Sequence, residues 1–473
     1  MLHSRDFDTP ALDETELRHL YERALERSVQ LRARRVRHRA AAGTVALAVL
    51  AVVGLVTASL AATTPGRRPA AGPSVRHTTW RLVSEVSAAG SSWQVLSPSG
   101  YGQTFSLVCP SDTSCYADSI GGQLEYTNDG GSTWQQATGT GTATSAPQIW
   151  CTDAQDCDVL ADIAGSGSTF LTTADGGQTW TSQPGPAASL GGAPTNPPST
   201  SQNGLAQDSM SCATISSCVV VDYHGDFSGA STQVFATSDG GASWSEAAFP
   251  SPASGDFMPS GLNCTATTCV TVGSIVGPFT QFQSGSGSAY GGQGVRVLAG
   301  AAFTSDDGGA TWSASSAPPS AGAGQINSLT CPDATGCYVA ATGAVFETQD
   351  GGQTWAQVST TSQLPGPSGS YNGWGFTSIS CATSSLCWLT GAAMPQPSPG
   401  SSGQQPIGIG QAQGLLASTA DGGSTWALSA PPAGVGGVID VTCPDSTTCF
   451  ALGVEQTGPA PSNSEIVLLT NAS

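Results

Sequence analysis

The stretch Cys331–Trp355, CPDATGCYVAATGAVFETQDGGQTW, contains the pattern that decides the fold. Two cysteines six positions apart are followed by two short apolar runs and by a turn, rich in Asp and Gly, that ends in Trp. The same order of features recurs along the chain. One structural unit has therefore been repeated, and repetition at a fixed period predicts a modular architecture.

The Asp-Gly-Gly turn occurs six times and the cysteine pair seven times, which uses all fourteen cysteines. The turns are Thr127–Trp134, Thr173–Trp180, Thr237–Trp244, Ser305–Trp312, Thr348–Trp355 and Thr419–Trp426. The cysteine pairs are Cys109/Cys115, Cys151/Cys157, Cys212/Cys218, Cys264/Cys269, Cys331/Cys337, Cys381/Cys387 and Cys443/Cys449. The repeats are about 56 residues apart, which is near the period of β-propeller blades.

Each repeat indicates four short strands. In the quoted unit these are Ile326–Thr330, Tyr338–Ala341, Ala344–Thr348 and a strand that Trp355 opens. The Asp-Gly-Gly sequence turns the chain before Trp355, because glycine reaches positive φ without steric cost and Asp can bond the backbone ahead of it. A single four-stranded blade cannot bury both faces, so blades must stack around an axis. The sequence predicts an all-β, seven-bladed β-propeller of four-stranded blades.

The repeated turn resembles the Asp-box, S/T-x-D-x-G-x-T-W, of the bacterial neuraminidase repeat (BNR) families. These include sialidases, sortilin-type receptors, some endoglucanases and photosystem II assembly factor-like proteins, all of them β-propellers, and the resemblance covers roughly residues 90–473. It implies that the box is a structural turn at the blade periphery, away from any active site. The box residues concerned are Asp129, Trp134, Asp175, Trp180, Asp239, Trp244, Asp307, Trp312, Asp350, Trp355, Asp421 and Trp426.

The N-terminal region indicates a membrane anchor. Residues 1–39 hold nine of the fourteen arginines and include a helical pattern, and residues 40–62 carry no charge. Val45–Ala62 is almost wholly apolar and long enough to cross a bilayer, and the arginines before it orient the N-terminus to the cytoplasm. We predict a cytoplasmic basic helix (1–39), an uncleaved transmembrane signal anchor (40–62), a Pro/Gly/Ala linker (63–78) and an extracellular propeller (79–473); cleavage as a signal peptide is the alternative.

The cysteines on the exported side predict disulfides, because that compartment is oxidising. Each pair encloses only four or five residues, so we expect each cysteine to bond within its own repeat. Zinc is the alternative, but only His77 and His224 follow the apolar segment and no CxxC spacing occurs. We therefore predict no metal site and no cofactor, although Asp222 with Asp226, or Asp153 with Asp156 and Asp158, leaves calcium open.

The seventh repeat ends without an Asp-box, so its fourth strand must come from elsewhere. Gly90–Leu96, GSSWQVL, resembles the end of a box, and Trp93 stands 16 residues before Cys109. We expect this N-terminal strand to complete the last blade and close the ring, with Trp80 as the alternative. Such a strand enters from the face that bears the boxes, so the opposite face should point away from the membrane.

The long insertions identify a candidate binding face. Strand order places the cysteine turns and the boxes on one face, and places Gln183–Asp208, Ser274–Gly300 and Ala392–Gly414 on the other. Loops on a rigid scaffold commonly carry binding residues. The aromatic candidates for stacking on a sugar or peptide are Tyr371, Trp374, Phe376, Tyr290 and Tyr223, with packing of these rings against a blade as the alternative.

Charge and missing residues restrict the function. From residue 82 onward one arginine stands against 26 acidic residues, a balance of −25, which repels nucleic acid and favours basic partners. The resemblance to sialidases implies a clamp of three arginines, whereas only Arg296 lies beyond Arg81, so sialidase activity is not expected. Glycoside hydrolysis needs only two carboxylates. Its candidates are Asp153, Asp156, Asp158, Asp162, Asp222, Asp226 and Asp256, none of which the sequence singles out as a pair.

We therefore expect a membrane-anchored exported propeller that acts as a binding or assembly module for an extracellular protein or glycan. A glycoside hydrolase with a carboxylate pair on the loop face is the alternative. The basic N-terminal helix could contact a cytoplasmic partner, whereas solvated positive flanking of the membrane segment is the simpler interpretation.

Overall fold

The computed structural model describes residues 79–86, 105–119, 124–141, 148–163, 167–186, 204–226, 229–278, 280–282, 292–294, 296–318, 325–367, 374–395, 412–456 and 464–471. Contacts divide the chain into Met1–Gly72 and Pro73–Ser473, and all described residues belong to the second unit. The expected cytoplasmic helix, membrane anchor and linker lie outside them. Among the described residues no helix is long and apolar enough to span a membrane.

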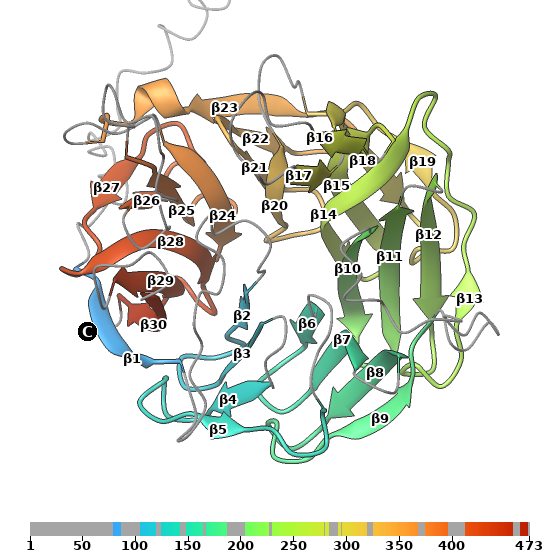
Figure 1. The fold of residues 1–473 in the computed structure, drawn as a ribbon, viewed down its shortest axis with the longest axis horizontal. Helices are drawn as coiled ribbons and strands as arrows, with labels where there is room; N and C mark the ends of the chain where they lie inside the picture. The colour runs from blue at the N-terminus through green and yellow to red at the C-terminus, as the bar shows by residue number, and fades with distance from the viewer. Residues whose placement is uncertain are drawn as a thin grey trace, which may run out of the picture. The chain divides into compact units, whose positions relative to one another are not determined.

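The described strands form seven four-stranded antiparallel sheets arranged as a ring of blades (Figure 1). The predicted seven-bladed propeller is therefore confirmed. Blade 1 consists of β2 (Phe105–Val108), β3 (Cys115–Ser119), β4 (Glu125–Thr127) and β5 (Gln135–Gln136). Blade 2 consists of β6 (Gln148–Cys151), β7 (Cys157–Ile163), β8 (Gly167–Thr173) and β9 (Thr181–Pro184). Blade 3 consists of β10 (Gly204–Thr214), β11 (Ser217–Asp226), β12 (Gly229–Thr237) and β13 (Ser245–Glu246).

The other blades follow the same order, and the first strand of each blade lies nearest the centre of the ring in Figure 1. Blade 4 consists of β14 (Asp256–Thr265), β15 (Thr268–Val276), β18 (Val297–Ser305) and β19 (Ser313–Ala314), with the hairpin β16 (Thr280–Phe282) and β17 (Gly292–Gly294) inserted. Blade 5 consists of β20 (Ile326–Thr330), β21 (Cys337–Ala341), β22 (Ala344–Thr348) and β23 (Ala356–Thr360), followed by the 3-10 helix η1 (Thr361–Gln363). Blade 6 consists of β24 (Gly375–Cys381), β25 (Cys387–Ala393), β26 (Gln413–Thr419) and β27 (Ala427–Ser429). Blade 7 consists of β28 (Val435–Thr442), β29 (Phe450–Gln456), β30 (Ser464–Thr470) and β1 (Arg81–Glu85).

An N-terminal strand closes the ring, as expected, but it is not the strand at Gly90–Leu96. β1 pairs antiparallel with β30, with Arg81 opposite Thr470 and Glu85 opposite Val467. Trp80, immediately before β1, is buried and meets Trp388 of blade 6 edge-on, with ring centroids 5.0 Å apart. The expectation that the strand at Trp93 closes the ring is therefore wrong, because β1 follows Trp80 and it is Trp80 that packs on Trp388. Trp93 itself lies outside the described residues.

The Asp-box is a turn closed by side chains. In blade 5 the Thr348 hydroxyl donates to Asp350 Oδ1 at 2.7 Å and accepts the Gly352 N–H at 3.0 Å. Asp350 also accepts the Thr354 N–H at 2.8 Å and the Thr354 hydroxyl. The hydrogen bond from the Thr354 hydroxyl is the main reason why the pKa of Asp350 lies below its ordinary value. Each box aspartate thus satisfies backbone and hydroxyl donors of its own turn, and five further boxes repeat the arrangement.

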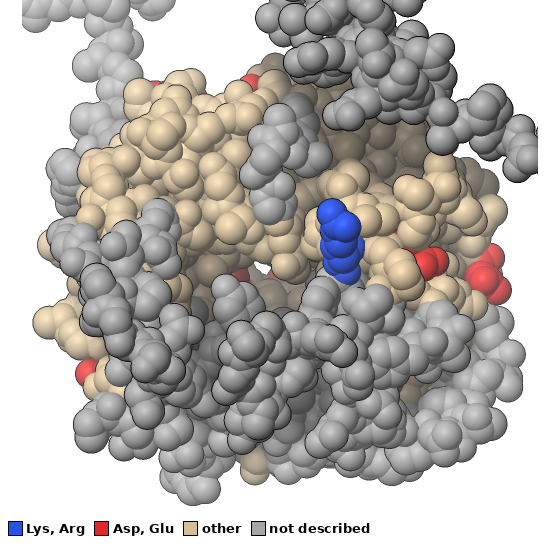
Figure 2. All heavy atoms as spheres, turned by 45° about the horizontal axis from the view of Figure 1, so that its top comes forward, with Lys and Arg blue, Asp and Glu red and all other residues tan. Residues whose placement is uncertain are grey.

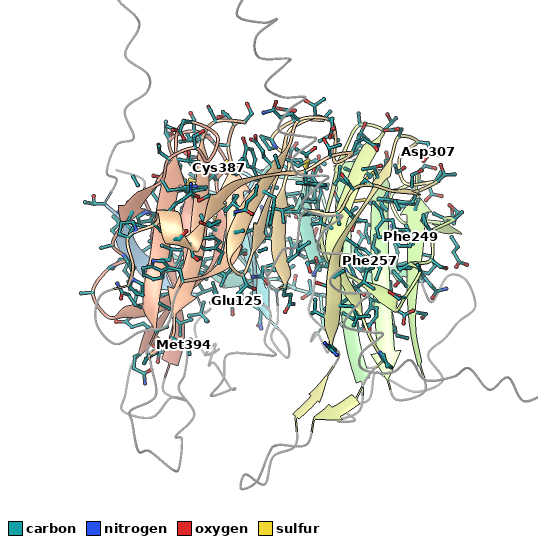
Figure 3. The ribbon with its side chains drawn as sticks, turned by 90° about the horizontal axis from the view of Figure 1, so that it is seen from above. Glu125, Phe249, Phe257, Asp307, Cys387 and Met394 are labelled. Carbon is teal, nitrogen blue, oxygen red and sulfur yellow. A yellow bond between two sulfur atoms is a disulfide. The ribbon has the colours of Figure 1, made fainter. Side chains whose placement is uncertain are left out.

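Each box also contacts the cysteine turn of its own blade. In all six boxes the first glycine N–H donates to a backbone carbonyl of that turn, over 2.7–3.1 Å. In blade 5, for example, Gly351 donates to Thr335 at 2.9 Å. Figure 3 shows Cys387 and Asp307 at one end of the ring and Met394 at the other. The cysteine turns and the boxes therefore share one face, which we call the box face, and the opposite one is the insert face.

The tryptophan of each box packs on the preceding blade. Trp244 of blade 3 meets Phe170 of blade 2 edge-on at 5.3 Å, and Trp180 of blade 2 meets Tyr116 of blade 1 at 6.1 Å. The second glycine of the box lies so close to that blade that a Cβ on Gly241 would stand 2.4 Å from Phe170. The box thus joins adjacent blades as well as turning the chain, which is how the repeated sequence produces a continuous core.

The seven disulfides lie within single repeats, as predicted. They join Cys109 to Cys115, Cys151 to Cys157, Cys212 to Cys218, Cys264 to Cys269, Cys331 to Cys337, Cys381 to Cys387 and Cys443 to Cys449. Each bond ties the end of the first strand of a blade to the start of the second. Seven such cross-links are typical of proteins from an oxidising compartment, which is consistent with an extracellular or secreted domain.

Candidate functional site

Three of the five predicted aromatic ligand contacts are core residues. Trp374 and Phe376 are buried among side chains of blades 5 and 6, and the Trp374 indole donates to the Pro365 carbonyl at 2.8 Å. Tyr223 is buried with Met258 and Val276 of blade 4. For these three rings the structure shows the alternative, packing against a neighbouring blade, so they are not exposed for stacking on a ligand. Tyr290 and Tyr371 lie outside the described residues.

Blades 3 and 4 extend further than the others on the insert face. Their first three strands have 9–11 residues, whereas those of blade 5 have 5. The extra length is at the end away from the cysteines, and the β16–β17 hairpin projects from this end (Figure 3). Arg296–Ala299, at the start of β18, is exposed at every position. The strands of blades 3 and 4 therefore project beyond those of blade 5 on the insert face.

The start of β18 is also a free sheet edge. β15 pairs with β18 from Val297 to Ser305, whereas β19 pairs only with Phe303 and Thr304 on the other side. In the described part of the chain no strand covers the outer edge before Ala302. Val297 is 38% exposed and Leu298 is 48% exposed. Backbone groups and apolar side chains are thus presented together at this edge.

The candidate carboxylates lie in different parts of the propeller and not at one site. Asp153 and Asp156 belong to the cysteine turn of blade 2, where Asp153 accepts the N–H groups of Gln155 at 2.8 Å and Asp156 at 3.0 Å. Asp158 is buried between blades 2 and 3, whereas Asp153 and Asp156 lie in the turn. Among the described residues these three acids do not form a group of possible metal ligands. Asp256 starts β14 and is half-buried. The side chain of Asp226 lies outside the described part.

Asp158 is buried between blades 2 and 3. Its Oδ2 lies 3.6 Å from Sγ of Cys218, and its Oδ1 has no hydrogen-bond partner among the described residues. Burial, with a contribution from the charge of Asp156, raises the pKa of Asp158 to about 7. Because Cys218 is oxidised, its sulfur can only accept a hydrogen bond. Asp158 can therefore donate to the disulfide only when it is protonated, and it is a structural group of the blade interface.

Asp208 and Asp222 stand directly opposite one another on β10 and β11. His224 lies two residues further along β11, on the same side of the strand, and its Nδ1 is 3.1 Å from Asp222 Oδ1. The ligand atoms of the three side chains lie within 4.8 Å of one another. Burial, then the charge and the hydrogen bond of Asp222, and then the charge of Asp162 in blade 2, raise the pKa of Asp208 well above its usual range.

Asp222 and Asp162 were candidates from the sequence, but Asp208 was missed. The sequence pattern places it at the end of the insertion Gln183–Asp208, whereas β10 begins at Gly204. A signal was present: Asp208 precedes Cys212 by four residues and Asp222 follows Cys218 by four. Because a hairpin pairs residues at equal distances from its turn, these spacings place the two carboxylates opposite one another.

This arrangement differs from that of glycoside hydrolases. Their two carboxyl groups face each other about 5–5.5 Å apart in retaining enzymes, or about 6.5–9.5 Å apart in inverting ones, with the sugar between them. Asp208 and Asp222 belong to one sheet and are within hydrogen-bonding reach. Figure 2 shows that charged side chains are sparse among the described residues of the face it displays. The pair is suited to sharing a proton or a cation.

Comparison with known proteins supports the repeat assignment. The family model described as BNR/Asp-box repeat matches residues 303–314. No curated protein matches the sequence. Among solved structures, "YCF48 bound to D1 peptide" is 15% identical with a TM-score of 0.48, and the match covers 86% of this chain and 100% of that one.

Two further structures align over most of this chain. YCF48 from Cyanidioschyzon merolae is 14% identical with a TM-score of 0.43, and the match covers 83% of this chain and 98% of that one. The GH74 xyloglucanase from Xanthomonas campestris is 14% identical with a TM-score of 0.42, over 83% of this chain and 55% of that one. With six boxes of one geometry, and with the family model matching one of them, the chain is a seven-bladed β-propeller built on BNR/Asp-box repeats.

Proposed function

We propose that the chain is an exported, membrane-anchored binding module whose ligand site lies on the insert face, at blades 3 and 4. The observation that carries this proposal is the free edge of β18. Arg296–Ala299 is exposed throughout, and no described strand covers this edge before Ala302. An exposed strand edge is a template for a further strand, and soluble proteins normally cover or charge it.

The ligand that fits this edge is an extended segment of a partner protein. Added as a strand, it would gain main-chain hydrogen bonds from β18 and apolar contact from Val297 and Leu298. The exported part has a charge balance of −25 from residue 82 onward, which attracts positively charged chains over distances of about 10 Å at moderate ionic strength. We therefore infer a ligand segment that carries Lys or Arg beside apolar residues.

This proposal can be tested with the full chain, purified in detergent, on an array of extended peptides that vary in charge and in apolar content. The double substitution Val297→Asp with Leu298→Asp should weaken capture of the basic, apolar peptides at least about 10-fold, because a charge replaces apolar contact at the edge. Ile215→Asp is the matched control, since Ile215 is 36% exposed and lies in the cysteine turn of blade 3 on the box face. Equal loss in both variants, or no peptide preference in the wild type, would contradict the proposal.

The direction of β1 supports an orientation for this module. Arg81 pairs with Thr470 at the box-face end of β30, and Glu85 pairs with Val467 further towards the insert face. The chain therefore enters blade 7 from the box face. With residues 40–62 as the anchor, we propose that the insert face points away from the membrane. Epitope tags in 284–288 and in 129–132, compared for antibody access on intact cells, test this; better access at 129–132 would contradict it.

A further inference from the structure

Asp208, Asp222 and His224 form a cluster that no part of the proposed peptide site uses. Asp208 and Asp222 are cross-strand partners on β10 and β11, and their side chains lie on the same side of the sheet as that of His224. The three ligand atoms lie within 4.8 Å of one another. A bound ion with ligand bonds of about 2.0–2.2 Å holds its donor atoms about 3–4.4 Å apart. The cluster therefore already has the dimensions of a coordination site after small side-chain adjustments.

The two carboxyl groups of this cluster face no lysine or arginine from the described part of blade 3. Carboxylates directly opposite one another on neighbouring strands are destabilising unless something compensates them. The sequence contains no lysine, and the arginines among the described residues are Arg81 and Arg296. Arg81 is on β1 in blade 7, and Arg296 precedes β18 in blade 4. Neither arginine belongs to blade 3, so His224 is the basic group that the described part of this blade supplies beside the pair.

Two carboxylate oxygens of the cluster point to a missing ligand. Oδ1 of Asp208 and Oδ1 of Asp222 are shielded from solvent, and neither is in hydrogen-bond geometry with a described residue, although Nδ1 of His224 is 3.1 Å from the second. Buried polar atoms are almost always bonded, and an ion is one of the few explanations for an exception. The His224 side chain is 53% exposed, whereas that of Asp222 is 12% exposed. The cluster thus has two oxygens shielded from solvent and an exposed side, at His224, through which an ion can enter.

We propose that Asp208, Asp222 and His224 bind one divalent transition-metal ion of the Zn²⁺ or Mn²⁺ type. Two carboxylates and one imidazole suit these ions, whereas Ca²⁺ and Mg²⁺ prefer oxygen donors alone. Three protein ligands leave at least one position open on a Zn²⁺ ion. Because His224 is on the solvent side, that position faces outward, where a carboxylate, phosphate or imidazole of a ligand can complete the coordination.

The test is titration calorimetry on the full chain, expressed without a histidine tag, purified in detergent and stripped with a chelator. Zn²⁺, Mn²⁺, Ca²⁺ and Mg²⁺ are each added alone. We expect one Zn²⁺ or Mn²⁺ per chain and much weaker binding of Ca²⁺ and Mg²⁺. Loss of a residue that only supports a metal ligand typically weakens binding about 10–100-fold. Asp222→Asn and His224→Ala each remove a ligand, so each should weaken binding by more than that.

Asp112→Asn is the matched control, because Asp112 is an exposed acid in the cysteine turn of blade 1 and should leave the affinity unchanged. His224→Ala changes an exposed side chain, so it separates ion binding from folding if Asp222→Asn proves unstable. Zn²⁺ should also raise the unfolding temperature of the wild type and of Asp112→Asn, but not of His224→Ala. Binding that persists in both site variants, tight binding of Ca²⁺ alone, or no binding by the wild type would each overturn the proposal.

Discussion

The carboxylate of Asp440, on the first strand of blade 7, accepts the backbone N–H of Leu107, on the first strand of blade 1, across 3.2 Å. The hydroxyl of Ser378, on the first strand of blade 6, donates to the other oxygen of Asp440 at 2.7 Å. Asp440 therefore bridges three blades at the point where the ring closes. In blade 5 Ser328 holds the equivalent position and accepts the Ile379 N–H of blade 6 at 3.3 Å. At the ring closure the carboxylate of Asp440 therefore makes the contact between blades that the hydroxyl of Ser328 makes in blade 5.

Asp440→Asn should change how stability depends on pH. Burial raises the pKa of Asp440 from 3.8 to about 6, against the lowering effect of its hydrogen bonds. Between these values the unfolded chain has released this proton and the folded chain retains it, so stability falls as pH rises from about 4 to about 6. The shift corresponds to about 3 kcal/mol. Relative to wild type, the Asn variant should therefore gain about 3 kcal/mol of unfolding free energy between pH 4 and pH 7.

Denaturant unfolding of wild type and Asp440→Asn at several pH values measures this difference. At pH 4 the comparison mainly reports the geometric cost of replacing the acid by the amide, because both side chains are then neutral in the folded chain. A difference that stays constant from pH 4 to pH 7 would mean that Asp440 does not change its protonation state in that range, and would refute the prediction.

Asp158→Asn should stabilise the protein above neutral pH. The buried carboxyl has a pKa of about 7, so stability is lost as pH rises from about 4 to about 7, and the full loss corresponds to about 4 kcal/mol. The neutral amide avoids this loss and can still donate towards Sγ of Cys218, which lies 3.6 Å from Oδ2. Thermal unfolding at pH 5 and pH 8 should show the variant gaining on wild type at the higher pH. A variant that is less stable than wild type at pH 8 would contradict this.

The fold was predictable because its determinants are local and repeated. The box residues bond within eight positions of one another, as Thr348, Asp350 and Thr354 do, and the two cysteines of a disulfide are six positions apart, or five in one repeat. Such contacts appear in the sequence as fixed spacings. Four-stranded blades of one residue pattern then have few ways to bury their apolar faces other than a ring.

The candidate site was less predictable because it depends on contacts between distant residues. Trp80 closes the ring through Trp388, which is 308 positions away and leaves no spacing signal. Trp374 and Phe376 sit in a Gly-rich segment that suggests an exposed loop, yet blades 5 and 6 bury them. Asp208 lies beside a long insertion, which obscures its strand, although its spacing from Cys212 equals that of Asp222 from Cys218.

Neighbouring glycines of one box should differ in their tolerance of alanine. Both Gly308 and Gly309 have positive φ, at 73° and 91°, so alanine is strained at either position. A Cβ on Gly308 meets nothing within 4 Å, whereas a Cβ on Gly309 would lie 2.4 Å from Cγ2 of Val219 in blade 3. We expect Gly308→Ala to cost about 1 kcal/mol and Gly309→Ala about 2–4 kcal/mol.

Because the two variants share one turn, the difference between them measures the contact between blades and not the backbone strain. Denaturant unfolding of both proteins against wild type provides the measurement. Equal losses would show that the box does not press on the preceding blade, and that positive φ alone accounts for the second glycine.

The ring closure should depend on Trp80 far more than on its neighbour Leu82. Trp80 is 6% exposed and packs with Trp388, Leu416 and Leu469 in the core between blades 6 and 7. Leu82 is 39% exposed on the closing strand. Trp80→Ala should therefore cost about 3–5 kcal/mol, the usual range for removing a buried aromatic ring, whereas Leu82→Ala should cost less than about 1 kcal/mol.

Unfolding of the full chain in denaturant measures these losses, and hydrogen exchange of β30 provides a local readout. Loss of the closing strand exposes the outer edge of β30. Exchange at Val467–Thr470 should therefore accelerate in Trp80→Ala and stay near the wild-type rate in Leu82→Ala. Unchanged exchange at Val467–Thr470 in Trp80→Ala would mean that β1 stays paired without its buried anchor.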